Sequence, residues 1–253
     1  MDYSKFSESL DYVVNQLKAG AKIQLEARKQ ITAKQTCEDN QHYWNSRQDR
    51  ELFKETLDRV YDCLRTADKY GGRVFGGFVR NILIPTIFEQ TINGYKDVDI
   101  WFQSQENADL FVVAMGDKLA KGTDSTEKIS EEVVYPFARQ QYFLKGKYIV
   151  GNNEPEKEDD IIIDVIVSME LPVNDFDVNQ LTYSSTERYK SFGSRSVEKL
   201  MSCIVNKKAT MLPGYSLGKK HSMHYNIQSK RIYKLIQCGW TILNQTGEKL
   251  SHV

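Results

Sequence analysis

The chain has 253 residues, and its 34 Lys and Arg balance 34 Asp and Glu, so the formal net charge is zero. This neutrality excludes a general nucleic-acid coat protein, which needs a basic excess, and any contact with nucleic acid must come from a local patch. A hydrophobic content of 40% with 11% aromatic residues excludes a disordered chain, because it supplies a sizeable core.

The cysteines predict a reduced, intracellular and cytoplasmic protein. Four are present, Cys37, Cys63, Cys203 and Cys238, and they form no Cys-x-x-Cys pair or disulfide pattern. No apolar run approaches the ~20 residues that span a bilayer, and residues 1–4 do not resemble the start of a secretory signal. We therefore expect no membrane partner.

Apolar residues at helical spacing predict two N-terminal helices, over residues 4–34 and 47–69. We expect both to be packing elements that could mediate self-association, and the sequence leaves the oligomeric state open. After Gly71 the pattern predicts a short strand at 73–75, two glycines, and an apolar run that continues to Ile84. Pro85 then predicts a loop.

Further along, alternation predicts a strand over Asp97–Phe102. Ser104 is typical of a helix N-cap, and we expect a helix over 105–120. The residues expected on its buried side are Leu110, Phe111, Val113, Met115 and Leu119. Residues 133–150 predict a hairpin broken at Gly146.

The most strand-like segment is 161–167, and helices are expected at 196–206 and 229–243. This order predicts an α+β fold with a small mixed sheet, N-terminal helices and a helical, basic C-terminal region. The expected division is 1–70 for the N-terminal helices, 71–183 for the mixed sheet and 184–253 for the C-terminal region.

Three carboxylates stand on the predicted strands. Asp97 and Asp99 share one face, about 7 Å apart, because side chains alternate along a strand. Asp164 interrupts a run of isoleucines and valines, where a carboxylate is costly unless it is paired or binds a cation. If the two strands are neighbours, the carboxylates converge into an oxygen-rich site of the kind that binds Mg²⁺. An Asp-x-Asp alone is more often a solvated surface.

The upstream element makes the pattern more specific. A strand runs into Gly76 and Gly77 and then into a predicted helix, so the backbone there can approach an anion closely. Arg80 lies near the first turn and can pair with a phosphate.

Together, the Gly-Gly-Phe-Val-Arg stretch at 76–80 and the Asp-Val-Asp-Ile stretch at 97–100 resemble the head of the polymerase-β-like nucleotidyltransferases. The similarity is nearest to tRNA CCA-adding enzymes and bacterial-type poly(A) polymerases, whose Asp-Phe-x-x-Asn-x-Leu segment resembles residues 175–181. The amino-acid sequence also resembles nucleotidyltransferase-like proteins of large DNA viruses. This resemblance would place the protein in the host cytoplasm. The resemblance covers roughly residues 71–183.

This resemblance implies transfer of a nucleotidyl group from an NTP to a hydroxyl, with two Mg²⁺ or Mn²⁺ ions as cofactors. It implies catalytic and metal-binding roles for three carboxylates, Asp97, Asp99 and Asp164. It implies nucleotide-binding roles for Gly76, Gly77, Arg80 and Asn179. The chain departs from the family at Asn81, where Asp is usual, and at Val173 and Asn174, where the family has two arginines. These departures leave the NTP preference and the acceptor open.

The C-terminal third carries a basic block. Residues 186–235 hold 11 Lys and Arg against 2 Asp and Glu, and tyrosines interleave with them. This pattern suits a polyanion such as RNA, although a solvated helical face explains it equally well. The candidate RNA-binding residues are Arg188, Lys190, Lys207, Lys208, Lys219 and Lys220.

Two alternatives remain. The acceptor is expected to be an RNA 3′ end, but the same head fold also serves small-molecule and protein acceptors, and a catalytically silent relative would only bind a nucleotide or a partner. His221 and His224, with Cys203 and Cys238, match no common zinc spacing and are expected to be ordinary residues.

Overall fold

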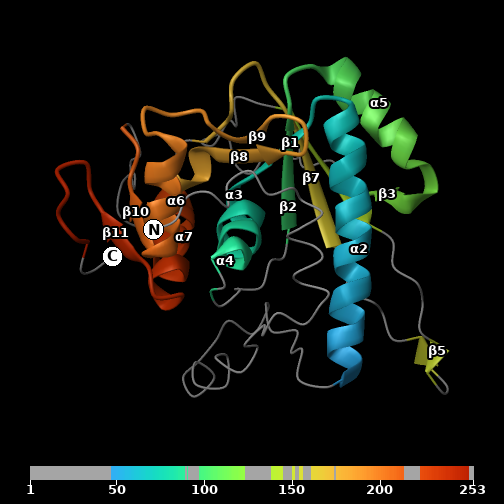
Figure 1. Ribbon diagram of the computed structural model, residues 1–253, viewed down its shortest axis with the longest axis horizontal. Coiled ribbons are helices and arrows are strands. Elements are labelled where there is room, and N and C mark those ends of the chain that lie inside the picture. Colours follow the sequence, from blue (N-terminus) through green and yellow to red (C-terminus); the bar gives the residue numbers. More distant parts are fainter. Residues whose placement is uncertain are drawn as a thin grey trace.

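The computed structural model describes residues 47–88, 90, 97–122, 138–144, 150–151, 154–155, 161–173, 175–213 and 223–250. Seven strands form one mixed sheet in the order β3-β4-β7-β2-β1-β8-β9, and helices pack against it (Figure 1). Only the pair β2–β7 is parallel in this sheet, and every other neighbouring pair is antiparallel. The predicted α+β fold with a mixed sheet is confirmed. The predicted helix at 4–34 lies outside the described residues.

The helices and strands follow one another along the chain in two groups, before and after residue 121. The first half contains α2 (Arg47–Lys69), β1 (Arg73–Phe75), α3 (Gly76–Phe78), a π-helical turn (Val79–Leu83), α4 (Ile84–Ile87), β2 (Asp97–Phe102), α5 (Gln105–Met115), a 3-10 turn (Gly116–Lys118) and β3 (Leu119–Lys121). The second half contains β4 (Ala138–Leu144), β5 (Val150–Gly151), β6 (Glu154–Pro155), β7 (Ile161–Val167), a 3-10 turn (Asp177–Gln180), β8 (Leu181–Ser184), β9 (Arg188–Ser191), α6 (Val197–Val205), β10 (Lys208–Thr210), α7 (Met223–Gln237) and β11 (Thr241–Leu243).

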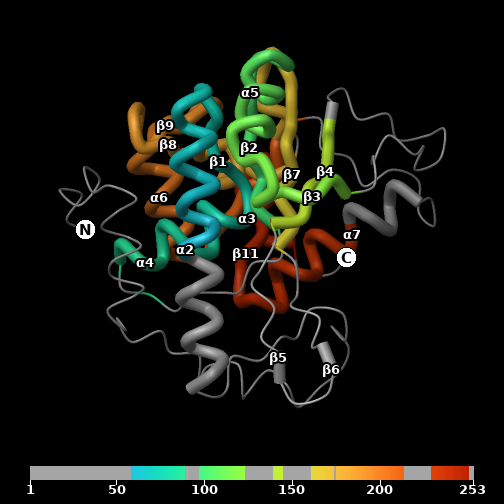
Figure 2. Tube along the Cα trace, turned by 90° about the vertical axis from the view of Figure 1, so that its right-hand side faces the viewer, coloured from blue at the N-terminus to red at the C-terminus, as the bar shows by residue number. Residues whose placement is uncertain are grey.

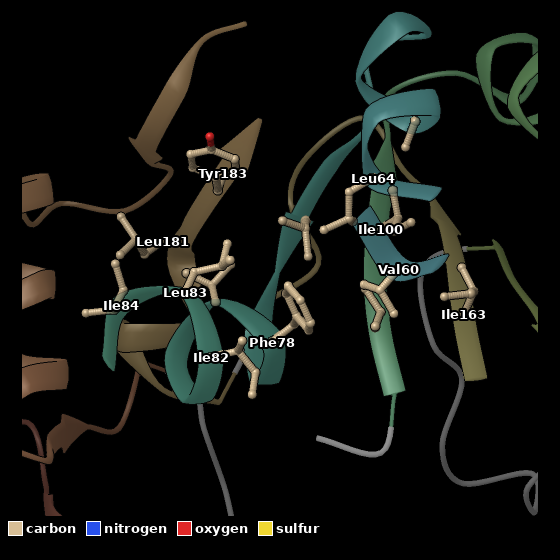
Figure 3. Close-up of a cluster of buried hydrophobic side chains, with 14 of the residues drawn as sticks. Val60, Leu64, Phe78, Ile82, Leu83, Ile84, Ile100, Ile163, Leu181 and Tyr183 are labelled. Carbon is tan, nitrogen blue, oxygen red and sulfur yellow. The ribbon is translucent and has the colours of Figure 1, made fainter. Parts of the chain in front are cut away.

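One face of the sheet carries the main hydrophobic core. Alternate residues of β2 and β7, such as Val98, Ile100 and Ile163, are fully buried there. They meet the apolar stripe of α2, including Val60 and Leu64 (Figure 3). Helix α5 lies beside α2 (Figures 1 and 2). This helical layer leaves the opposite face of the sheet to the polar residues of β2 and β7.

The opposite face holds a second, smaller hydrophobic cluster. Phe75, Trp101 and Ile166 form it, and Phe192 packs against them with its ring edge-on to Trp101. Since side chains alternate, this is also the face on which Asp97, Asp99 and Asp164 lie. The cluster therefore forms the apolar floor next to the carboxylates.

Two helical segments differ from the sequence prediction. Helix α5 has the predicted Ser104 cap, which accepts from the backbone N–H of Asn107, but it ends at Met115 because Gly116 takes a left-handed φ of 50°. Leu110 and Val113 are 45% and 76% exposed, so the prediction that they are buried is wrong, whereas Phe111, Met115 and Leu119 are buried as predicted. Pro85 does not begin a loop but lies in α4, directly after the π-helical turn Val79–Leu83.

The predicted hairpin around Gly146 does not form among the described residues. Strand β4 instead pairs with β3 and β7, both antiparallel. A short separate pair forms between β5 and β6. The sequence showed extended character in this region but not which strands would become neighbours.

The region after Ser184 contains more than helices. Strand β9 belongs to the main sheet, and β10 pairs in parallel with β11 near α6 and α7, on the side of the molecule away from α5 (Figure 1). Helix α7 spans Met223–Gln237, so it begins and ends earlier than the helix expected at 229–243, and Thr241–Leu243 form β11 instead. Gly239 at φ 81° follows the end of α7, and Trp240 is buried. The described helices include none long and apolar enough to cross a bilayer.

A buried arginine ties β1 to the β8–β9 hairpin. Arg73 donates to the hydroxyls of Thr182 and Ser184, to the carboxylate of Glu187 and to the backbone carbonyl of Arg188. Burial lowers the pKa of Arg73, while the charges of Glu187 and Asp68 act in the opposite direction. The guanidinium is thus held by four hydrogen bonds to the β8–β9 hairpin.

Candidate functional site

Asp99 and Asp164 are register partners on the parallel strands β2 and β7. Directly opposed residues of neighbouring strands point to the same face, so the two carboxylates lie next to each other. Asp97 is two residues before Asp99 and shares its face. The prediction that the two acidic strands are neighbours is confirmed, since β2 pairs with β7 along its whole length.

Gly76 lies directly beside this pair. Phe75 is the register partner of Asp99 across β1 and β2, so the chain turns into Gly76 at the carboxylate. Gly76 has a left-handed φ of 68°, and a Cβ built on it would stand 2.9 Å from Asp99 Oδ2. Only glycine fits this position without displacing the carboxylate or straining the backbone.

Gly77 and Arg80 follow in the continuous helical segment from Gly76 to Ile87. A Cβ at Gly77 would meet only Arg80 Nη2, at 4.0 Å, so the space above Gly77 is open apart from this guanidinium. Arg80 donates from Nε to Asn81 Oδ1 at 3.2 Å and from Nη1 to Asn179 Oδ1. None of the hydrogen bonds found among the described residues uses Arg80 Nη2, which lies next to Gly77.

Asn179 is held in turn by Asp175. Its Nδ2 donates to Asp175 Oδ1 at 2.9 Å, and the other oxygen of Asp175 accepts from Arg231 of α7 at 3.2 Å. Trp240 lies under Arg80, with the guanidinium carbon 5.6 Å from the ring centroid. The sequence predicted Arg80 and Asn179, which the structure brings together, but gave no signal for Arg231.

Arg139 was also missed by the sequence. It lies on β4 opposite Ile166, so it shares the face of Asp164, and its Nη2 donates to Asp164 Oδ2 in an ion pair. Asp164 is fully buried, and its other oxygen, Oδ1, has no hydrogen-bond partner in the described part of the chain. A half-bonded buried carboxylate is costly and points to a missing ligand.

The carboxylates act on one another electrostatically. Burial, together with the charges of Asp97 and Asp164, raises the pKa of Asp99 to about 8, against the opposing charges of Arg139 and Arg231. Burial lowers the pKa of Arg80, and the neighbouring carboxylates, including Asp175 and Asp99, oppose that shift. The site thus has excess negative charge that a cation would relieve.

The donor set fits a hard divalent cation. It consists of carboxylate oxygens only, it includes the orphaned Oδ1 of Asp164, and Gly76 leaves room beside Asp99. Within the described ranges, however, no three His, Cys, Asp or Glu side chains gather closely enough to hold a metal ion. Asp97, Asp99 and Asp164 share a face, but in this structure Asp164 is turned to Arg139.

The candidate RNA-binding residues have different surroundings. Lys190 is exposed and opposite Thr182, which bonds Arg73 on the carboxylate face, so Lys190 lies on that face too. Lys208 is exposed, whereas the Nζ of Lys207 is bonded to the Cys238 carbonyl at 3.2 Å. A further candidate, Arg188, is half-buried. Lys219 and Lys220 lie outside the described residues.

The comparison with solved structures found two similar chains. A CCA-adding enzyme in complex with CTP is 17% identical with a TM-score of 0.43, over 77% of this chain and 44% of that chain. The Thermotoga maritima CCA-adding enzyme complexed with tRNA is 16% identical with a TM-score of 0.41, over 79% and 40%. The chain spans less than half the length of these enzymes. No protein-family model matches the sequence, and the search of curated proteins found no match.

Proposed function

We propose that this chain is a metal-dependent nucleotidyltransferase, which moves a nucleotidyl group from an NTP to a hydroxyl acceptor. One observation carries the proposal: Asp99 lies opposite Asp164 on parallel strands, with Gly76 at the turn directly beside Asp99. This places acidic oxygens next to the backbone of a strand-to-helix turn, where Gly76 is buried and Gly77 is half-buried. Carboxylates suit the cations of a triphosphate, and such a turn suits its phosphates.

In the proposed reaction the acceptor oxygen attacks the α-phosphorus, the bond to the bridging oxygen breaks, and pyrophosphate leaves while the hydroxyl proton goes to water. Asp97, Asp99 and Asp164 would hold two Mg²⁺ or Mn²⁺ ions. When bound, such ions lower the pKa of the attacking hydroxyl and neutralise charge on the triphosphate. No side-chain nucleophile is required.

The chain's own residues would position the triphosphate. The backbone of Gly76 and Gly77 would approach the phosphates, and Arg80 would pair with them through the Nη2 that lies next to Gly77. Asn179 would keep the guanidinium in place through its bond to Nη1. Arg80 is thus oriented before the nucleotide arrives, which lowers the entropic cost of binding.

An RNA 3′ end is the acceptor we propose. Lys190 lies on the carboxylate face, and α7 contains no acidic residue while exposing Lys230, Tyr233 and Lys234 on one side. Tyr233 is 57% exposed, which suits stacking on a base. Arg231 of the same helix reaches Asp175, next to Asn179, so an RNA on α7 would lie near the nucleotide.

The experiment is incubation of the protein with Mg²⁺, each labelled NTP in turn, and a short RNA. Extension of the RNA supports the proposal in full. Label on the protein or on an added small alcohol keeps the transferase and replaces the acceptor. Nucleotide binding without turnover under all conditions would identify a silent relative and contradict the enzymatic proposal.

A further inference from the structure

The ion pair between Arg139 and Asp164 lies at the place where the proposed function needs a cation. Asp164 is 0% exposed, whereas the side chain of Arg139 is 31% exposed. The arginine therefore covers the carboxylate from the open side. Nη2 of Arg139 donates to Oδ2 of Asp164, while Oδ1 of Asp164 remains buried and without a hydrogen-bond partner in the described ranges.

All three carboxylates act on Arg139. Burial lowers its pKa, but the hydrogen bond and charge of Asp164, with the charges of Asp99 and Asp97, raise it overall. Arg139 is thus a cation that all three carboxylates attract, and it is directly bonded to Asp164. A guanidinium and a divalent ion both need the oxygens of Asp164, and they repel each other, so both cannot bind there at full strength.

We propose that Arg139 is a displaceable counter-ion of the site: it holds Asp164 in the metal-free protein, leaves it when a cation arrives with a triphosphate, and then pairs with the phosphates. This inference rests on the proposed function and adds a regulation of the same site. The planar guanidinium suits either role, because it binds carboxylates and phosphates in the same bidentate manner.

The exchange couples the cation to the triphosphate. A cation alone must displace Arg139 from its ion pair with Asp164, so it binds weakly. A triphosphate offers that partner, so each ligand strengthens the other by the same factor. The coupling would keep Asp164 from being loaded with metal before a nucleotide is present.

The first test is calorimetric titration of Mn²⁺ into the metal-free protein, without nucleotide. Arg139→Gln removes the competing charge and should bind Mn²⁺ about tenfold more tightly than the unchanged protein. Arg139→Lys keeps the charge and should bind it as weakly as the unchanged protein. Equal or weaker Mn²⁺ binding by Arg139→Gln would overturn the proposal.

The second measurement is of phosphate affinity, which Arg139→Gln should lower although it raises Mn²⁺ affinity. Inorganic tripolyphosphate, titrated at saturating Mg²⁺, should bind Arg139→Gln about tenfold more weakly, because one charge-assisted phosphate contact is lost. General damage to the site would weaken both ligands together. Unchanged tripolyphosphate binding would show that Arg139 does not reach the phosphates and would contradict that half of the proposal.

A matched control is available at Arg195, which pairs with the buried carboxylate of Asp177 at 2.5 Å and is similarly exposed. Arg195→Gln removes the same kind of ion pair and should leave Mn²⁺ affinity unchanged. If Arg139→Gln is unfolded in EDTA, added Mn²⁺ should refold it, as followed by circular dichroism; failure to refold at any Mn²⁺ concentration counts against the proposal.

The outcomes separate the two proposals. If neither the unchanged protein nor Arg139→Gln binds Mn²⁺, the metal site is absent, and the proposed function fails with it. If both bind Mn²⁺ with equal affinity, the proposed function stands and the role of Arg139 is overturned. Asp164→Asn, combined with Arg139→Gln, should abolish the gain in affinity, because the oxygen that Arg139 releases is then no longer charged.

Discussion

Gly76 lies in contact with Asp99, so closely that a Cβ on the glycine would stand 2.9 Å from Oδ2 of the carboxylate. The contact arises because Phe75, the last residue of β1, is the register partner of Asp99. The turn and the carboxylate are thus parts of one local structure. A substitution at Gly76 should therefore also displace the carboxylate of Asp99.

Gly76→Ala should weaken both the fold and cation binding. The left-handed φ of 68° costs a β-carbon roughly 1–2 kcal/mol, and the new methyl pushes Asp99 away. Gly116→Ala is the matched control, since Gly116 has φ 50° with nothing within 4 Å of its Cβ position. Gly116→Ala should lower the free energy of unfolding but leave Mn²⁺ affinity unchanged. Urea unfolding and Mn²⁺ titration measure the two effects, and equal Mn²⁺ affinity in both variants would contradict the expectation.

Gly77→Val should lower triphosphate affinity and leave the fold and the carboxylates in place. The added side chain meets only Arg80 Nη2 in the protein, but it fills the space that phosphate oxygens need. Tripolyphosphate binding at saturating Mg²⁺ should fall, while Mn²⁺ binding without phosphate stays the same. Unchanged tripolyphosphate binding would show that this turn does not hold phosphates.

Asp99→Asn should stabilise the metal-free protein at high pH. The pKa of Asp99 is raised from 3.8 to about 8, so the folded state holds a proton that the unfolded state releases, and stability is lost as pH rises from about 4 to about 8. Asparagine carries no such penalty. Urea unfolding in EDTA should show the variant more stable than the unchanged protein at pH 8.5 and equal to it near pH 4. A difference that is independent of pH would refute this reading.

Asp97→Asn should abolish nucleotidyl transfer to undetectable levels and leave the melting temperature unchanged or higher. One carboxylate of the proposed cation site is lost, while like-charge repulsion with Asp99 is relieved. Asp109→Asn serves as the control, because Asp109 is exposed on α5, bonded only to Gln105 among the described contacts, and on the helical layer. Its transfer rate should match that of the unchanged protein.

Charge reversal on α7 should weaken RNA binding more than tripolyphosphate binding. Lys230→Glu with Lys234→Glu should flatten the salt dependence of RNA affinity by about one unit of slope for each lost phosphate contact. Lys69→Glu with Lys118→Glu reverses two exposed lysines on the helical side and should have little effect. Tyr233→Phe should retain RNA affinity that Tyr233→Ala loses, if the ring stacks. Fluorescence anisotropy with a short RNA measures all of these.

The sequence predicted the features that depend on neighbouring residues. Alternation along one strand was enough to place Val98 and Ile100 in the core and Asp99 on the other face, as found. The cost of burying Asp164 indicated that this carboxylate needs a partner or a cation. The pairing of β2 with β7 was the condition under which the carboxylates would share one site, and the structure meets it.

The sequence could not predict contacts between distant segments. Arg139 is 25 residues from Asp164, in a stretch where nothing marks one residue as a partner of the site. The bond from Arg231 to Asp175 likewise depends on where α7 packs. Leu110 and Val113 misled the helix prediction because apolar residues occur on both sides of α5, and only the tertiary structure decides which side is covered.

Arg73 limits how the protein can be shortened. Its four hydrogen bonds end on residues of the β8–β9 hairpin, the last of them on the backbone of Arg188. A fragment that stopped at residue 183 would keep β1 but would bury a guanidinium deprived of Ser184, Glu187 and Arg188, a costly state. The smallest autonomous unit containing the carboxylates must therefore extend through β9, and deletion series designed around the motif-bearing stretch alone should yield insoluble protein.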